Sequence, residues 1–104
     1  MAINSTKRSA SNTRREDASA LYNAFLALDS EKECAAFMRD LCTLKEIKAM
    51  KERFAIAELI AKDVSYRDIS DTVGASTTTV TRVSHWFHHG MGGYRTIISR
   101  MKKR

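Results

Sequence analysis

The stretch VSYRDISDTVGASTTTVTRVSHWF, residues 64–87, decides the fold of this chain. Ser65 is placed to cap a short helix, and Gly74 follows where a left-handed residue would end that helix. Ser76 is then placed to cap a second helix. A short helix, a glycine turn and a capped second helix have the spacing of a helix-turn-helix, which we expect over residues 65–88.

The apolar residues of this stretch predict how the two helices pack. Ile69 and Val73 stand four apart on the first helix, so they share one face. Val80 and Val83 are expected to face back toward them from the second helix. Small residues at the corner, which let the helices cross closely, are Ser70 and Ala75. Together these residues are a fairly specific sign of a helix-turn-helix, a unit that also serves in protein contacts.

Threonines crowd the start of the second helix, although a branched β-carbon makes threonine a mediocre helix former. If Val80 and Val83 point inward, the threonines occupy the outer face and first turn, which a recognition helix presents to the major groove. Their hydroxyls can bond a base or a phosphate, and their methyls can meet the methyl of thymine. The alternative is a merely solvated polar face. The residues of this helix start that we expect to contact DNA are Ser76, Thr77, Thr78, Thr79 and Thr81.

Charge is distributed unevenly along the chain, whose net charge is +6. Residues 1–15 carry four bases and no acids, whereas residues 16–64 carry ten acids and seven bases. Residues 65–104 carry seven bases and two acids. Basic ends around a mildly acidic middle favour a polyanion at one surface, and we expect double-stranded DNA as the partner.

Apolar residues recur at helical spacing elsewhere in the chain, beginning near Asp17. Ser30, with Glu33 three residues later, has the capping-box spacing that predicts the start of a second helix. Thr43 and Glu46 repeat this signal before a longer helix. The stripes that predict these helices and a last one are Leu21, Phe25 and Leu28; Cys34, Phe37, Met38 and Leu41; Ile47, Met50, Phe54, Ala57 and Ile60; and Tyr94, Ile97, Ile98 and Met101.

The predicted fold is all-α, with five to six helices and a helix-turn-helix in the C-terminal half. The chain has 104 residues with no proline and four glycines, which favours helices joined by short turns. Residues 1–15 are expected to be a disordered basic arm, and residues 16–104 a helical dimerisation and DNA-binding domain. The N-terminal stripes are wide for so short a chain, which predicts a homodimer with interlocking helices; a monomeric bundle is the alternative.

Several classes of function are not indicated. No nucleophile with a neighbouring base is visible, so we expect no enzyme and no cofactor. The chain has no apolar run long enough to span a bilayer, and Met1–Ala20 lacks a signal-peptide core, so a cytoplasmic protein without membrane contact is expected. Cys34 and Cys42 are interpreted as buried apolar thiols in a reducing compartment.

The histidines allow two interpretations. His85 and His89 stand four apart, a spacing that can chelate a metal, but two ligands alone make a poor site. No metal site is therefore expected. His88 is instead included among the residues that contact DNA, because the negative end of the helix dipole favours a cation near a phosphate there.

From about Leu41 to Met101 the chain resembles the Trp repressor superfamily, and more closely its YerC/YecD branch. The resemblance rests on TLKEIKAMKERFAIAELI, SYRDISDTVGASTTTVTRVS and HHGMGGY. It implies an all-α, intertwined homodimer that binds operator DNA and represses transcription. It also implies that Arg67 contacts a phosphate, and that Arg53 and Arg82 hold the positions that sandwich a corepressor indole.

Two residues depart from that family pattern. Val83 stands where the Trp repressor has a glycine that leaves room for the corepressor ring, and Trp86 stands where it has a serine that meets the ligand. Both add volume to a close-packed site. The tryptophan pocket is therefore expected to be filled from within, with Trp86 as a built-in ligand. Alternatively, Trp86 is a core or dimer-interface residue, and Arg53 and Arg82 serve DNA phosphates.

The resulting prediction is a sequence-specific DNA-binding transcriptional repressor that does not use L-tryptophan as its corepressor. One alternative is a repressor that senses an aromatic amino acid. The other is a helical assembly module that uses the helix-turn-helix for subunit contacts. The sequence leaves open whether any small-molecule effector exists.

Overall fold

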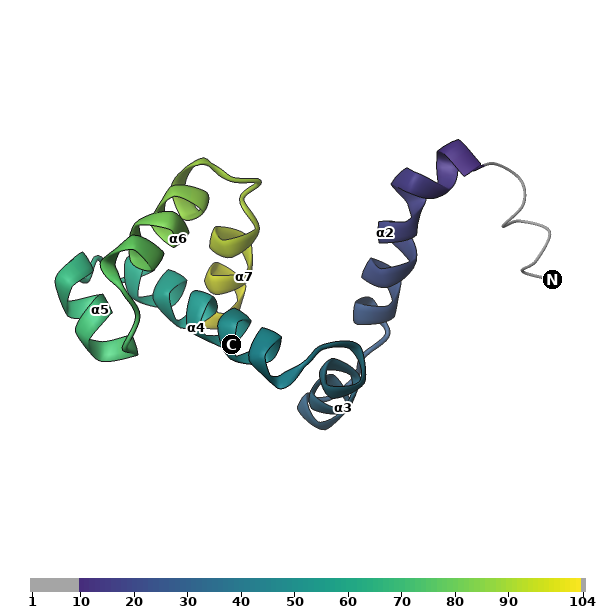
Figure 1. Cartoon of the computed structure of the whole chain (residues 1–104), viewed down its shortest axis with the longest axis horizontal. Coiled ribbons are helices and arrows are strands. Elements are labelled where there is room, and N and C mark those ends of the chain that lie inside the picture. The colour runs from purple at the N-terminus through teal and green to yellow at the C-terminus, as the bar shows by residue number, and fades with distance from the viewer. Residues whose placement is uncertain (1–9, 104) are drawn as a thin grey trace. The chain divides into compact units, whose positions relative to one another are not determined.

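The computed structural model describes residues 10–103, with side chains from residue 18 onward (Figure 1). Within this range the protein is all-α and contains no strand, which confirms the predicted fold class. Its six helices are α2 (Ala10–Leu26), α3 (Glu31–Leu41), α4 (Leu44–Ala61), α5 (Tyr66–Val73), α6 (Thr77–His89) and α7 (Gly93–Lys102). None of the described helices is both long enough and apolar enough to cross a membrane.

Helix α2 begins earlier than the apolar pattern predicted. It starts at Ala10 rather than near Asp17, so the part of the predicted arm from residue 10 onward is helical. This segment contains alanine and arginine, which favour helix, and no glycine or proline that would stop one. The first nine residues of the predicted arm lie outside the described range.

The chain forms two compact units, the first ending at Leu41 and the second beginning at Cys42. In the first unit, the rings of Phe25 and Phe37 meet edge to face with 5.3 Å between their centroids. No side chain from Ala18 to Leu41 is buried. The predicted domain of residues 16–104 runs through both units, and its existence as a single domain stays a prediction.

The two predicted capping boxes have different outcomes. At the start of α4, the Thr43 Oγ1 atom accepts from the Glu46 N–H at 3.1 Å, and the Glu46 carboxylate accepts from the Thr43 N–H at 2.9 Å, so this box is complete. Before α3, the Ser30 Oγ atom accepts from the Glu33 N–H at 3.1 Å. The Glu33 carboxylate, however, accepts from the N–H of Asp29 at 2.8 Å, one residue earlier than the box requires.

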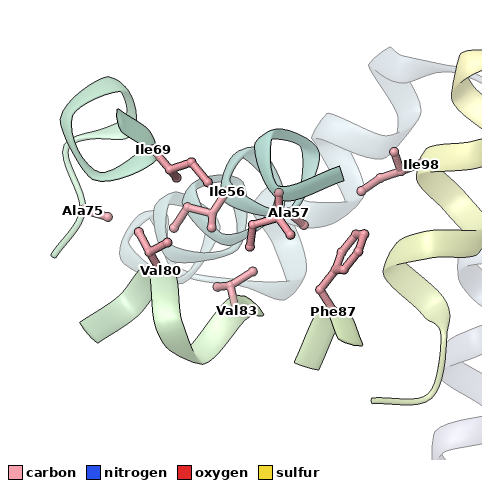
Figure 2. Close-up of a cluster of buried hydrophobic side chains, with 9 residues drawn as sticks. Ile56, Ala57, Ile69, Ala75, Val80, Val83, Phe87 and Ile98 are labelled. Carbon is pink, nitrogen blue, oxygen red and sulfur yellow. The ribbon is translucent and has the colours of Figure 1, made fainter. Parts of the chain in front are cut away.

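The hydrophobic core lies in the second unit. Figure 2 shows side chains of α5, α6 and α7 gathered around Ile56 and Ala57 of α4. Ile69 and Val80 are fully buried, and Val83 is buried, which confirms the predicted inward faces of the helix-turn-helix. Val73 is half-buried against the same cluster. The buried apolar residues are Ile56, Ala57, Ile60, Ile69, Ala75, Val80, Val83, Phe87 and Ile98.

The interpretation of both cysteines as buried thiols is wrong for the single chain. Cys34 is exposed on α3 and Cys42 is half-buried, and neither is in a disulfide. The physical reason is that α3 buries none of its residues within this chain, so its apolar stripe has no core to enter.

Candidate nucleic-acid interface

Helix α5 is capped at both ends by the residues that the sequence indicated. The Ser65 Oγ atom accepts a hydrogen bond from the Asp68 N–H at 3.1 Å. Gly74 ends the helix in the left-handed region, at φ 81°, and its N–H donates to the Ser70 carbonyl at 2.9 Å. A β-carbon on Gly74 would meet no atom within 4 Å, so it is the backbone conformation and not a lack of space that favours glycine.

The corner after Gly74 is held by a side chain. The Ser70 hydroxyl donates to the carbonyl oxygen of Ala75 at 2.5 Å. Ala75 itself is buried, as expected of a small apolar residue at a close crossing of two helices. This bond fixes the path of the chain between α5 and α6.

Ser76 begins α6 as its N-cap. Its Oγ atom accepts from the Thr79 N–H at 3.1 Å, and it also lies 3.1 Å from the Thr79 hydroxyl. Thr79 is half-buried, whereas the other threonines of α6 are exposed. Both residues are predicted DNA contacts, but here their hydroxyls bond each other and stabilise the first turn of the helix.

The outer face of α6 is polar. Thr78, Thr81, His85 and His88 follow one another at i, i+3, i+7 and i+10, and all four are exposed. Thr77, in the first turn, is exposed as well. The opposite face carries the buried residues of this helix, which are Val80, Val83, Ser84 and Phe87. A weak helix former is tolerated at this start because the cap and the buried face stabilise the helix.

The predicted phosphate contact, Arg67, is the second residue of α5 and is exposed. Its neighbour Tyr66 shares a hydrogen bond with Ser84 on the buried face of α6. Sequence reasoning missed this pair, which joins two residues 18 apart in the chain. The one available signal was a serine at a position of α6 where the helical period calls for an apolar residue.

The residues of the predicted effector pocket lie together on the wall of a hollow of about 550 Å³. They are Arg53 of α4 and Arg82, Val83 and Trp86 of α6, and the wall is completed by Ala49, Glu52, Thr79 and Tyr94. The expectation that this space is filled from within is wrong for the single chain. Trp86 remains 61% exposed and therefore neither fills the hollow nor belongs to the core.

Trp86 and Val83 differ in burial although they lie one turn apart on α6. Val83, one turn earlier, enters the core at 3% exposure, whereas the ring of Trp86 lies edge to face against His85 with 5.0 Å between centroids. Gly90 sits close to the Trp86 backbone, because a β-carbon there would lie 2.5 Å from the Trp86 carbonyl oxygen. Only glycine fits at this approach.

The histidines of α6 lie near one another at its C-terminal end. The rings of His85 and His89 are 5.3 Å apart between centroids, and those of His88 and His89 are 6.3 Å apart. Within the described part of the chain, no three histidine, cysteine or acidic side chains group together as metal ligands would.

Two short helices across a glycine turn, with a buried inner face and an exposed polar outer face, define a helix-turn-helix protein. The Trp repressor protein family matches residues 16–102, nearly the whole chain. The chain therefore belongs to the Trp repressor family, whose members are DNA-binding regulators.

Known relatives agree with this membership and place the chain in the YerC branch. It is 32% identical over 90 residues to the uncharacterized protein YerC of Bacillus subtilis (strain 168), covering 86% of each chain. A TrpR-like protein from Eubacterium eligens ATCC 27750 superposes with a TM-score of 0.81 at 30% identity, over 88% of this chain and 95% of that one. A candidate Trp repressor from Staphylococcus aureus superposes with a TM-score of 0.79 at 35% identity, over 83% of this chain and 86% of that one.

Proposed function

We propose that this protein is a homodimeric, sequence-specific transcriptional repressor that binds double-stranded DNA and does not use L-tryptophan as its corepressor. The observation that carries the proposal is the two-sided character of α6. Its inner face is buried against α4 and α5, while Thr77, Thr78 and Thr81 are exposed. In a helix-turn-helix these outer positions face the edges of bases in the major groove.

Positive charge on the same part of the chain supports a polyanionic partner. Residues 65–104 carry seven bases and two acids, and Arg67 and Arg82 are exposed on the two helices of the motif. Arg67 is proposed to contact a phosphate, and His88 to extend the polar stripe of α6 along the DNA. Phosphate contacts set the position of the protein, and base contacts supply its specificity.

Exposed apolar side chains support a homodimer, because a soluble monomer rarely leaves so many uncovered. A second hollow of about 440 Å³ has a largely apolar wall, which includes Phe54, Trp86 and Ile97. The large hydrophobic side chains that the single chain leaves exposed are Leu21, Tyr22, Phe25, Leu26, Leu41, Leu44, Tyr66, Trp86, Met91, Ile97 and Met101. We propose that a second copy of the chain covers most of them.

The proposal excludes L-tryptophan because of two side chains on the wall of the first hollow. Val83 supplies a branched side chain where the resemblance implies a glycine, and Trp86 supplies an indole where it implies a serine. The positions to which the resemblance assigns the glycine and the serine of a corepressor site are therefore altered on the wall that also carries Arg53 and Arg82.

A second candidate is a repressor that senses an aromatic amino acid. The hollow favours it, since about 550 Å³ remains open and two arginines lie on its wall. Calorimetry with L-tryptophan distinguishes the two candidates.

The proposed function is tested by selecting bound sites from a pool of random duplexes with the purified protein. We expect a two-fold symmetric consensus, because a symmetric dimer presents two copies of α6. Binding to the selected site should weaken steeply as salt rises, since several phosphates are neutralised. Failure to enrich any sequence would contradict the proposal.

A further inference from the structure

One polar side chain lies inside the apolar core of the second unit. Ser84 is 4% exposed on the inward face of α6, among Val80, Val83 and Phe87. A hydroxyl taken out of water without a hydrogen-bond partner destabilises the folded state, so a serine in this place needs one. Among the described residues, no buried side-chain nitrogen or oxygen lacks a partner.

The partner of Ser84 comes from the other helix of the motif. The Tyr66 hydroxyl shares a hydrogen bond with the Ser84 Oγ atom. Tyr66 is the first residue of α5, and Ser84 lies two turns beyond the start of α6. The bond therefore joins the far end of α5 to the middle of α6.

Two other contacts also hold α5 against α6. At the corner, the Ser70 hydroxyl bonds the Ala75 carbonyl, and beyond it Ile69 and Val80 belong to the same buried cluster. Helix α5 has eight residues, so it is about 12 Å long at 1.5 Å per residue. The N-terminal end of α5 is tied to α4 through Val64, whose N–H donates to the Leu59 carbonyl at 3.1 Å and whose side chain packs against the core. Neither contact fixes that end toward α6. The bond of Tyr66 restrains that end.

The restrained end of α5 carries the proposed phosphate contact, because Arg67 directly follows Tyr66. We propose that the Tyr66–Ser84 hydrogen bond positions Arg67 relative to the exposed threonines of α6. Arg67 can then contact a phosphate while the threonines contact the bases of the same DNA site. This inference rests on the proposed DNA-binding function and assigns Tyr66 and Ser84 as positioning residues that act through Arg67.

The single change Tyr66→Phe is an ambiguous test, because it leaves the Ser84 hydroxyl buried without a partner and lowers stability. The double variant Tyr66→Phe/Ser84→Ala removes both hydroxyls and leaves no unpaired group, so its thermal stability should stay near that of the unmodified protein. Ser99→Ala, which removes an exposed hydroxyl from α7, is the matched control.

We expect the double variant to bind the selected duplex about three- to tenfold more weakly, a range that corresponds to the net free energy of one hydrogen bond. Arg67→Ala should then weaken binding less in the double variant than in the unmodified protein, because the guanidinium is no longer held on its phosphate. A purely structural role for the pair would leave the effect of Arg67→Ala unchanged.

The two proposals fail in different ways. An unmodified protein that shows no sequence preference would overturn the proposed function, and the positioning role with it. An unmodified protein with a clear preference, whose double variant matches it in affinity and in sensitivity to Arg67→Ala, would overturn the positioning role alone.

Discussion

The two units of this chain use apolar residues in opposite ways. The second unit buries nine apolar side chains around α4, with Ile56 and Val80 at 0% exposure. The first unit also has apolar side chains at helical spacing, yet none of its side chains from Ala18 to Leu41 is buried. The difference shows that the second unit is organised by its own core, whereas the described part of the first unit has no buried core of its own. The two helices of the helix-turn-helix, which we propose to contact DNA, belong to the second unit.

The largest expected effect tests the core of the second unit. Ile56→Ala should lower the free energy of unfolding by about 2–5 kcal/mol, because it leaves a cavity among residues that pack on all sides. Leu59→Ala, on the same helix but only half-buried, should cost less and serves as the matched control. Denaturant titration followed by circular dichroism measures both. Equal losses of unfolding free energy in the two variants would contradict the burial pattern of α4.

The next prediction tests the dependence of the first unit on a partner. Leu26 is 81% exposed in the single chain, so Leu26→Asp should cost little if the protein is a monomer. In the proposed dimer it places a charge in the interface and should shift sedimentation toward the monomer. The unmodified protein should show a thermal midpoint that rises with protein concentration. A compact monomer with a concentration-independent midpoint would contradict the dimer.

A smaller effect separates phosphate contacts from base contacts within the second unit. Arg67→Ala should weaken binding to all duplexes alike and reduce the slope of log affinity against log salt by about one per contact. Thr81→Ala should instead relax preference at particular base pairs, at about 1–3 kcal/mol for a good contact. Gel-shift titrations with selected and scrambled duplexes measure both.

Thr79→Ala supplies the matched control for Thr81→Ala, because the Thr79 hydroxyl is bonded to Ser76. We expect a smaller loss of base preference from Thr79→Ala than from Thr81→Ala. The reverse order would mean that the half-buried threonine, rather than the exposed one, reads the bases.

The last prediction is that L-tryptophan has no effect on DNA binding. L-Tryptophan should bind no more tightly than about millimolar, which corresponds to roughly −4 kcal/mol, and should leave operator affinity unchanged. The variant Val83→Gly/Trp86→Ser enlarges the hollow and is expected to bind the amino acid more tightly, although the lost packing of Val83 lowers stability. If calorimetry shows that the unmodified protein binds L-tryptophan with micromolar affinity, and the amino acid tightens operator binding, the result would favour the aromatic-amino-acid sensor.

The helix-turn-helix was predictable from sequence because its signals are local. Ser65, Gly74 and Ser76 act on backbone groups within a few residues of themselves, and helical spacing alone turns Val80 and Val83 inward. The start of α2 was mispredicted because apolar periodicity marks where a helix packs, and a helix can extend beyond its packed part.

Features that depend on distant surfaces were not predictable in the same way. Cys34 is exposed because α3 buries none of its residues in the single chain. The Tyr66–Ser84 bond joins residues that no periodic pattern relates. Added side-chain volume at Trp86 was expected to fill the hollow, but volume does not determine in which direction a ring points.

The complete capping box at Thr43 and Glu46 has a consequence for α4. Thr43 and Glu46 exchange both capping hydrogen bonds with each other, so the start of α4 is fixed by two residues three apart in the chain. The helix that supports the core of the second unit therefore has a start that its own sequence specifies, independent of long-range packing.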